Sequence, residues 1–520
     1  MRASLSLIIF LSLRTAHLNS STAEKLSPDS DLPTSDSRRL ESTANDNNAW
    51  RPMRILVHYL DEKDSSDLKL ILLKKVVIPE AIKFLENTIQ VKGPKIIQPF
   101  NSSLCDSEFE MPKKYKTDPT NADFIIFFGV YDQDDSQFAS ARYCLFSPYD
   151  QRPLVGVSAV NLRYLTTDGD KVRTHIKIII HEILHALAFD QDLFDRFPNK
   201  QFSYVNITDP TTFDKRRVRI TSPGILALGA RHYGCPTYEG LEMENEGSQA
   251  SVHAHFEKRF LGIELMTAEA VNEPVISEFA LTFLNDSGWY LADLSKAEKL
   301  TFGASKGCGF IAATCSSSFS EFCTTEGASE CTPDYSGVQV CAMSDYSNKC
   351  YLKQIVPELI CRNNVFSDKN YFLGESFGQN SRCLTKSINN VKVPGCFKSY
   401  CINANQLLVS INNTNVTCNS NTTTVTLQDI TVHCPDLADF CSKAFPSRCK
   451  DNCNDRGVCN ADGTCSCNYM YTGAACQEVR ECSSDMGALC QALLQPTSLS
   501  ENSERTFISL LTLIMAFVIY

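Results

Sequence analysis

The sequence predicts an α+β protein of several domains, and three observations lead to this prediction. The chain has 520 residues, which is too long for one ordinary domain. Within residues 50–190, short apolar runs typical of strands are interleaved with helical patterns, which favours a sheet covered by helices. The 24 cysteines are an even number, begin at Cys105 and mostly follow Cys308, so we expect a cysteine-rich second half.

The N-terminal residues indicate that the chain enters the secretory route. Arg2 precedes an apolar run over residues 5–13, and small and polar residues follow, which is the pattern of a signal peptide that we assign to residues 1–22. On a secreted route the cysteines are expected to form disulfides. Six Asn-x-Ser/Thr triplets fit this route, at Asn101, Asn206, Asn285, Asn412, Asn415 and Asn421.

Residues 23–49 are polar and contain no cysteine, and we assign them to a short pro-segment or a disordered stretch. A thiolate from this segment therefore cannot block a metal. Arg38 and Arg39 fit a processing site and a pair of solvated arginines about equally well.

Three strands are expected in the first domain. Residues 53–60 and 124–128 are rich in apolar and β-branched side chains. Pro153–Asn161 is the third strand, and Pro153 and Gly156 suggest that it lies at the sheet edge.

A helix is expected to begin at Pro79, with Ile82, Leu85 and Ile89 on one face. A second helix follows the third strand and packs on the sheet. Cys105 and Cys144 are the only cysteines before that second helix, so they are natural partners for each other.

The second helix carries the motif His181-Glu182-Ile183-Leu184-His185. Residues four apart share one face of a helix, so His181 and His185 can direct their imidazoles at one point, where neutral nitrogens suit zinc. Glu182 is then placed to act as a general base. The motif arises by chance in a chain of this length at a rate on the order of one in a hundred. The histidines could also be core residues bonded to backbone carbonyls, so a third ligand must decide.

The helix has a local alternative. Its β-branched residues lose rotamer freedom in a helix, so a strand up to Ile180 is an option. We favour the helix because packing on a sheet commonly overrides propensity. The residues concerned are Ile176, Ile178, Ile179 and Ile180.

No histidine follows the motif closely, and the position three after His185 is Ala188. The segment beyond Asp190 is expected to be an inserted subdomain. Its basic run is interpreted as a solvated face. This run comprises Lys215, Arg216, Arg217 and Arg219, and the next histidines are His232, His253 and His255.

Around His255 the chain resembles the leishmanolysin family of metzincin zinc proteases. That family has an HExxH helix, a long insertion, then a third histidine followed by an aromatic residue, Glu, a basic residue and Arg. Here His255-Phe256-Glu257-Lys258-Arg259 follows the motif after 69 intervening residues (255 − 185 − 1), and the turn Glu264-Leu265-Met266 comes next. The similarity runs discontinuously from about Trp50 to past Cys315. Its other blocks are Cys235-Pro-Thr-Tyr-Glu-Gly-Leu-Glu-Met-Glu, Ala280-Leu281-Thr282, Gly288-Trp289-Tyr290, Ala292-Asp293 and Ser295-Lys296-Ala297-Glu298.

This resemblance implies a metzincin-like zinc protease domain in which His181, His185 and His255 hold one Zn²⁺ per chain. It implies that Glu182 activates a zinc-bound water to hydrolyse peptide bonds of protein substrates. It also implies that Met266 is the Met-turn residue beneath the metal. His253 competes with His255 as third ligand, but the Phe-Glu-Lys-Arg that follows fits only His255.

Two expectations depend on local backbone geometry. Ala188 stands where the family has glycine, and Ala tolerates a positive φ poorly, which puts the tightness of the helix exit in doubt. By analogy with metzincins, an edge strand near residues 155–160 could bind substrate by strand addition.

The second half is expected to be structural. Residues 306–445 are interpreted as a loop-rich, disulfide-stapled domain. Residues 446–480 resemble an EGF-like module, which could serve adhesion or act as a spacer. That resemblance implies the disulfides Cys449–Cys459, Cys453–Cys465 and Cys467–Cys476.

A linker over residues 481–506 leads to an apolar tail, residues 507–520. The tail is shorter than the roughly 20 residues of a spanning helix. With the small and polar residues before it, this pattern favours a GPI-attachment signal over a short membrane helix or a buried terminal helix.

Taken together, the sequence predicts a monomeric zinc endopeptidase at the cell surface. The HExxH helix belongs to an N-terminal catalytic subdomain (50–190), and the third histidine and Met-turn to an inserted and central subdomain (191–305). The alternative is a surface adhesion protein that keeps the fold without catalysis. A purely structural zinc site is disfavoured, because such sites have four protein ligands.

The expected partners are protein or peptide substrates, and a membrane reached through a lipid anchor or the C-terminal tail. A nucleic-acid partner is not expected. The net charge is −11 and the pI about 5.4, whereas phosphate binding needs clustered Lys and Arg.

Overall fold

The computed structural model describes residues 49–494, apart from 61–65, 94–95, 102–109, 135–136, 209–215, 249–250, 270, 272, 313–314, 316–317, 363–373, 389, 446–448 and 460–462. The signal peptide, almost all of the pro-segment, the end of the linker and the apolar tail lie outside the described residues. Cys105 and Lys215 lie outside them too. What the sequence predicts for these parts stays a prediction.

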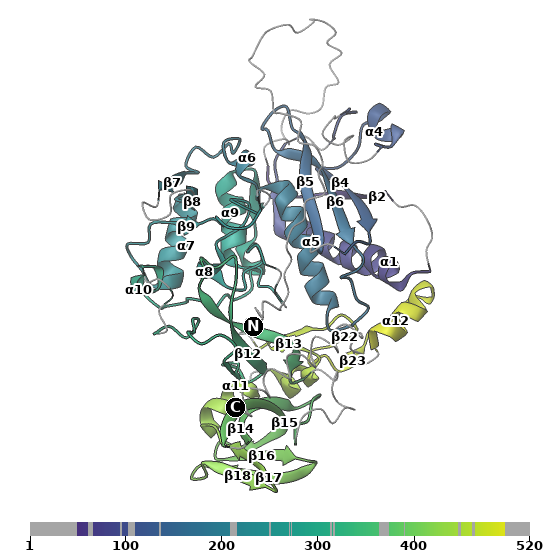
Figure 1. Ribbon diagram of the computed structural model, residues 1–520. Coiled ribbons are helices and arrows are strands. Elements are labelled where there is room, and N and C mark those ends of the chain that lie inside the picture. Colours follow the sequence, from purple (N-terminus) through teal and green to yellow (C-terminus); the bar gives the residue numbers. More distant parts are fainter. Residues whose placement is uncertain are drawn as a thin grey trace, which may run out of the picture.

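A four-stranded sheet forms the N-terminal part of the molecule (Figure 1). The strands lie in the order β2, β4, β6, β5; the first three are parallel, and β5 is antiparallel at the edge. The three expected strands and the α+β fold class are confirmed. Strand β5 was not expected, because its sequence is not markedly apolar. The bounds are β2 Ile55–Tyr59, β4 Phe124–Tyr131, β5 Ala139–Phe146 and β6 Pro153–Asn161.

Strand β6 lies inside the sheet, so its expected place at the edge is wrong. It pairs with β4 on one side and β5 on the other. Pro153 is tolerated because it is the first residue of the strand. Gly156 serves a different purpose: a Cβ there would lie 3.0 Å from the Cβ of Ala186 and 2.8 Å from the ring of Phe124, so glycine lets a helix approach the sheet. Since both sides of β6 are paired, it cannot bind substrate by strand addition.

The first helix begins earlier than Pro79 and ends earlier than Ile89. Ile82 and Leu85 are buried on it, as expected. Ile89 is also buried, but it opens strand β3 and does not belong to the helix, so that part of the prediction is wrong. The helical segment comprises α1 Leu68–Leu72, the π-helical turn η1 Leu73–Val77 and α2 Ile78–Thr88.

A small second sheet joins the start of the chain to its middle. Strand β3 (Ile89–Val91) pairs with β1 (Arg51–Pro52) and with β10 (Tyr290–Ala292). The chain that follows the HExxH helix is therefore joined to the N-terminal part by backbone hydrogen bonds.

The elements between residues 172 and 296 lie beside the four-stranded sheet (Figure 1). The expectation of a solvated basic face is wrong for Arg217 and Arg219, because both donate to the buried carboxylate of Glu242, at 3.3 and 2.9 Å. The elements are α5 Val172–Leu187, α6 Gln191–Phe194, β7 Tyr204–Thr208, β8 Arg216–Ile220, α7 Pro223–Tyr233, β9 Leu241–Glu242, α8 Lys258–Leu261, α9 Glu278–Ser287 and the 3-10 turn η2 Leu294–Lys296.

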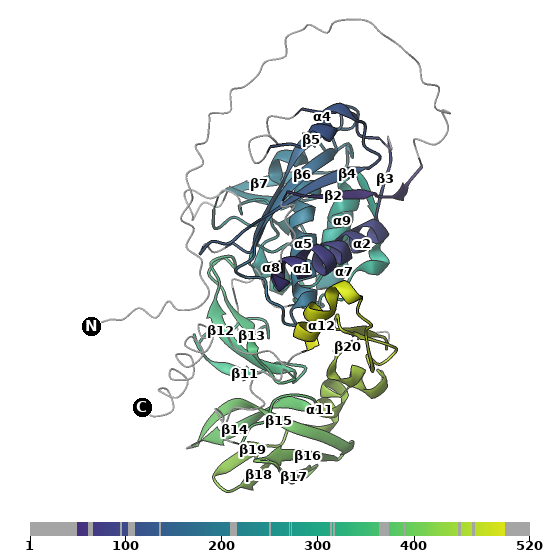
Figure 2. The same cartoon turned by 90° about the vertical axis from the view of Figure 1, so that its right-hand side faces the viewer.

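The second half is richer in strands than the sequence suggests. After helix α10 (Cys308–Ala312), a three-stranded sheet is followed by a six-stranded one in the order β17, β16, β15, β14, β19, β18 (Figure 2). The strands are β11 Ser329–Cys331, β12 Gly337–Met343, β13 Tyr351–Ile360, β14 Ser381–Ile388, β15 Val391–Asn403, β16 Gln406–Ile411, β17 Thr414–Asn419, β18 Thr424–Leu427 and β19 Ile430–His433.

Short elements end the described chain. They are α11 Leu437–Ala444, the 3-10 turn η4 Lys450–Asp455, β20 Gly457–Cys459, β21 Cys465–Cys467, β22 Tyr471–Thr472, β23 Glu478–Val479, the 3-10 turn η5 Ser484–Met486 and α12 Gly487–Leu494. None of the helices within the described ranges of residues 49–494 has the length and apolar character needed to cross a membrane.

Disulfides cross-link this half, as expected for a secreted chain. The three pairs implied for residues 446–480 are present: Cys449–Cys459, Cys453–Cys465 and Cys467–Cys476. The other described pairs are Cys235–Cys308, Cys315–Cys350, Cys323–Cys341, Cys331–Cys383, Cys361–Cys396, Cys401–Cys441, Cys418–Cys434 and Cys482–Cys490.

One apolar core connects helix α5 with the last elements that the structure describes. The buried side chains of Met470, Leu489 and Leu493 belong to the same cluster as Val172 and Ile179 of α5. Helix α12 lies beside α1 in both views (Figures 1 and 2). Met470 and helix α12 thus pack on the region that contains helix α5.

Candidate metal centre

Helix α5 carries two of the candidate ligands. It spans Val172–Leu187, so the β-branched run 176–180 is helical and the local strand alternative is wrong. Tertiary packing explains this, because Ile179, Ile180 and Ile183 are at most 1% exposed in the main core.

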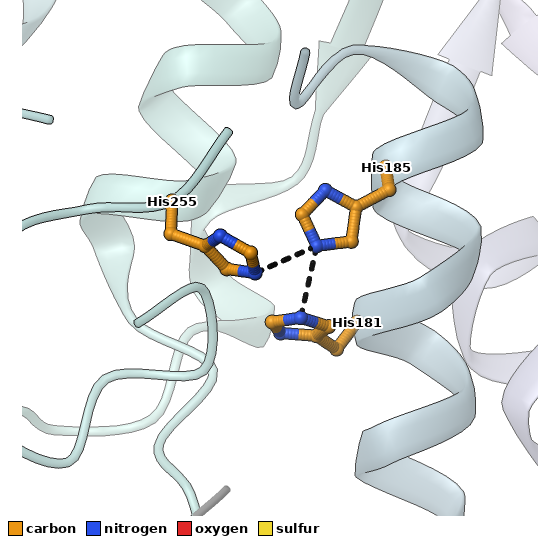
Figure 3. Close-up of side chains that lie close together, drawn as sticks. All are labelled: His181, His185 and His255. Atoms are coloured by element: carbon orange, nitrogen blue, oxygen red, sulfur yellow. Dashed lines mark hydrogen bonds between the residues drawn. The ribbon is translucent and has the colours of Figure 1, made fainter. Parts of the chain in front are cut away.

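Three imidazoles from two distant parts of the chain meet at one point (Figure 3). The Nε2 atom of His185 lies 2.9 Å from Nε2 of His181 and 3.0 Å from Nε2 of His255. One nitrogen of each ring lies within 4.8 Å of the others, a spacing that a single ion can bridge. The structure therefore brings together the three histidines that the sequence singles out.

The outer nitrogen of each ring contacts a backbone carbonyl oxygen. Nδ1 lies 2.7 Å from the oxygen of Leu265 in His181, 2.8 Å from that of Phe189 in His185, and 3.0 Å from that of Ser251 in His255. A carbonyl oxygen can only accept, so each Nδ1 carries the proton and donates it. In a neutral ring, Nε2 is then an unprotonated acceptor.

All three rings are neutral at ordinary pH. Burial lowers the pKa of His181 to about 3 and that of His185 to about 4, and it holds the pKa of His255 well below its usual value. Three unprotonated nitrogens cannot hydrogen-bond to one another, so their lone pairs repel unless a cation lies between them. A zinc ion, which prefers neutral imidazole nitrogen, fits this donor set.

His253 is not part of this cluster. Its Nδ1 lies 2.6 Å from the side-chain oxygen of Gln191 in α6, and its backbone φ is +61°. Although it is only two residues from His255, it contacts a different part of the structure.

The turn around Met266 adjoins helix α5, because Leu265 of this turn accepts the hydrogen bond from His181. Met266 is fully buried, its N–H donates to Glu264 at 2.5 Å, and its carbonyl oxygen accepts from Phe256. Ser277 also donates to Glu264, at 2.8 Å. Burial outweighs these hydrogen bonds and raises the pKa of Glu264 to about 7. Sequence reasoning noted Glu264 only as part of the turn, since nothing in its spacing reveals that it is buried.

The helix exit needs no glycine. Ala188 has φ −156°, outside the positive region that alanine tolerates poorly. The N–H groups of Ala188 and Phe189 both donate to the carbonyl oxygen of Leu184, at 2.9 and 3.0 Å. The difficulty expected from a positive φ therefore does not arise at Ala188, because its φ is negative.

Glu182 is next to the first histidine and is only 7% exposed. Burial raises the pKa of its carboxyl to about 8. A cation held by the neighbouring histidines would counteract this shift and favour the carboxylate, which is the form that can accept a proton.

Comparison with known proteins supports the same interpretation. The model of the leishmanolysin family, peptidase family M8, matches residues 64–350, more than half of the chain. This range includes the three histidines, Glu182 and Met266.

Individual relatives carry similar names. The leishmanolysin-like peptidase of Drosophila pseudoobscura pseudoobscura is 25% identical over 433 residues, covering 64% of this chain and 63% of that protein. The leishmanolysin of Leishmania donovani is 30% identical over 256 residues, covering 48% of this chain and 42% of that protein. The chain thus spans less than two thirds of the length of these relatives.

Proposed function

Because the chain belongs to the leishmanolysin family, we propose that it is a zinc-dependent endopeptidase acting on protein or peptide substrates. The observation that carries this proposal is the convergence of the unprotonated Nε2 atoms of His181, His185 and His255. These three histidines would hold one zinc ion per chain.

The zinc ion, when bound, would lower the pKa of water toward about 7 and polarise the peptide carbonyl. Glu182 is proposed as the acid/base residue. Its carboxylate would take a proton from the attacking water and later deliver a proton to the leaving amine. Met266 and its turn would support the imidazole of His181 from below through the adjoining carbonyl oxygen of Leu265.

Three neutral histidines leave a fourth coordination position for water, which is typical of a catalytic site. A structural zinc site would need a fourth protein ligand, and the described residues contain no fourth His, Cys, Asp or Glu in this group. This arrangement supports the peptidase over the structural alternative.

The proposed location is the cell surface. It is supported by the signal-peptide pattern of residues 1–22, the pattern of a GPI signal at 507–520, and the disulfides of the described chain. The domain boundaries given above and a monomeric state remain part of the proposal.

Glycosylation is proposed for the exposed acceptor sites, which are Asn101, Asn206, Asn412, Asn415 and Asn421. Asn285 differs from them. It is only partly exposed, and its side-chain oxygen accepts from the N–H of Ala292 at 2.6 Å while its amide nitrogen donates back at 3.4 Å, so it is not included in this proposal.

The test is a digest of casein by the wild-type protein, the Glu182→Ala variant and chelator-treated protein. Wild type should cleave casein, the variant should not, and zinc should restore the chelated sample. Equal activity of wild type and Glu182→Ala would reject the peptidase and favour an adhesion protein that keeps the fold.

A further inference from the structure

One face of helix α5 makes polar contacts near both of its ends. Arg173, Lys177, His181 and His185 follow one another at intervals of four residues, so they share this face. The two histidines at one end belong to the candidate metal centre. The two cations at the other end bind a single carboxylate, Glu298, which lies just after the 3-10 turn η2.

Glu298 and Lys177 form a compact polar cluster. The ammonium of Lys177 donates to Glu298 Oε2 at 2.6 Å and to the carbonyl oxygen of Pro274 at 2.7 Å. Arg173 donates to Glu298 Oε1 at 2.9 Å, and the N–H of Ile276 donates to Oε2 at 3.0 Å. The carboxylate therefore joins the helix to the segment 274–276.

Burial acts against the charges of this ion pair, and it lowers the pKa of Lys177 although Glu298 lies beside it. Burial would raise the pKa of Glu298, but the nearby charges of Lys177 and Arg173 outweigh it and lower that pKa overall. The side chain of Lys177 is 8% exposed. Leaving this cation without its carboxylate would be costly, since a buried charge needs a partner.

The segment 274–276 in turn supports the Met-turn. Leu265 donates its N–H to the carbonyl oxygen of Val275 at 2.8 Å, and Val275 donates to that of Ile263 at 2.8 Å. Leu265 then accepts the hydrogen bond from Nδ1 of His181. The path from Lys177 through Pro274, Val275 and Leu265 thus returns to α5 one turn later, and closes a ring of contacts.

We propose that Glu298 is a positioning residue of the metal centre, which holds α5 against segment 274–276 and so fixes the carbonyl oxygen that orients His181. This inference rests on the proposed zinc site. Within the described residues, no hydrogen bond or ion pair joins Glu298 to the three imidazoles or to Glu182. The sequence analysis names Glu298 only as part of a block that resembles the family. The sequence feature that could have drawn attention to Lys177 is a single cation within an apolar run, one helical turn before His181.

The test measures zinc affinity in Glu298→Gln and Lys177→Met. Glu298→Gln removes the charge that holds both cations, and Lys177→Met removes the donor to Pro274 while keeping an unbranched apolar chain. Each should weaken zinc binding roughly tenfold, at the low end of the 10–100-fold losses seen when partners of metal ligands are removed. Competition with a chromogenic chelator gives the dissociation constant without reference to activity.

The matched control is Glu375→Gln. Glu375 also pairs with a buried lysine, Lys386, and also accepts a backbone N–H, that of Cys396 at 2.8 Å, but it lies by the six-stranded sheet. The control should lose stability and keep wild-type zinc affinity.

The visible spectrum of the cobalt-substituted proteins should change for Glu298→Gln and stay unchanged for Glu375→Gln. Lys177→Arg, which keeps a cationic donor, should bind zinc more tightly than Lys177→Met.

If both site variants bind zinc as tightly as the control, with the same cobalt spectrum, Glu298 is only structural and the inference is overturned. If Glu298→Gln does not fold, Lys177→Met decides by the same criteria. A wild-type protein that binds no zinc would overturn the proposed function itself, which separates the two failures.

Discussion

His181 and Leu265 are joined by a hydrogen bond of 2.7 Å from Nδ1 to the carbonyl oxygen. This contact links the HExxH helix to the turn that contains Met266, although the two residues are 84 positions apart. A similar contact to Ser251 orients His255. Backbone carbonyl oxygens therefore orient the histidines of the candidate centre from both parts of the chain. The role of each residue can be tested separately.

Replacing Glu182 should abolish hydrolysis and spare the metal. Glu182→Gln keeps the size of the side chain and cannot accept the proton from water, so kcat should fall by about 10²- to 10⁴-fold. Zinc content, measured by elemental analysis after dialysis, should stay at that of wild type. Activity within a factor of about ten of wild type would show that the proton goes elsewhere.

His255 and His253 provide a matched pair. His255→Ala removes one of three converging nitrogens, so the zinc retained after dialysis should fall far below one ion per chain. His253→Ala removes a ring that contacts Gln191 and should retain zinc as wild type does. The opposite pattern would identify His253 as the ligand.

Stability should depend on pH through Glu264. Its pKa is about 7 in the folded state against 4.5 for the ordinary carboxyl. The folded protein therefore keeps a proton that the unfolded chain loses, and stability falls as pH rises from about 4.5 to 7, by on the order of 3 kcal/mol. Above about pH 7 this contribution no longer changes.

The Glu264→Gln variant cannot ionise, so it should lack this decline. An amide can still donate to Ser277 and accept from the N–H of Met266. Unfolding of chelator-treated protein at several pH values can be followed by the fluorescence of Trp289, which is 2% exposed. Parallel pH profiles for wild type and variant would contradict the assignment to Glu264.

The C-terminal helix α12 should stabilise the catalytic region. Leu489 is 1% exposed in the shared core, so Leu489→Ala should cost about 2–5 kcal/mol and lower the thermal unfolding midpoint. Leu494 of the same helix is 41% exposed, and Leu494→Ala should change stability by no more than about 0.5 kcal/mol. Equal midpoints would mean that the packing of α12 on this core does not contribute to stability.

The sequence predicted the candidate site better than the sheets. The HExxH helix is a local pattern, and the histidine at 255 follows from a shared block, so both could be placed without coordinates. The position of β6 could not, because Pro153 and Gly156 suggest an edge, whereas Gly156 in fact makes room for Ala186. The close approach of Gly156 to Ala186 joins two residues that are 30 positions apart in the sequence, so no local pattern reveals it.

The predictions for Ile89 and for the second half of the chain were wrong for a related reason. Helical periodicity extends naturally from Ile82 through Leu85 to Ile89, but pairing with β1 and β10 draws Ile89 into a strand. Residues 306–445 were expected to be loop-rich because of their cysteines, whereas their described part forms a three-stranded and a six-stranded sheet. Tertiary pairing overrode local pattern in both cases.

The anchoring of the three imidazoles also affects how the family can diverge. Each ring is oriented by a carbonyl oxygen of the main chain, at positions 189, 251 and 265, and every residue type supplies that oxygen equally. Side chains at these positions can therefore drift without releasing a ring. Only an insertion, a deletion or a change in the course of the backbone would release a ring.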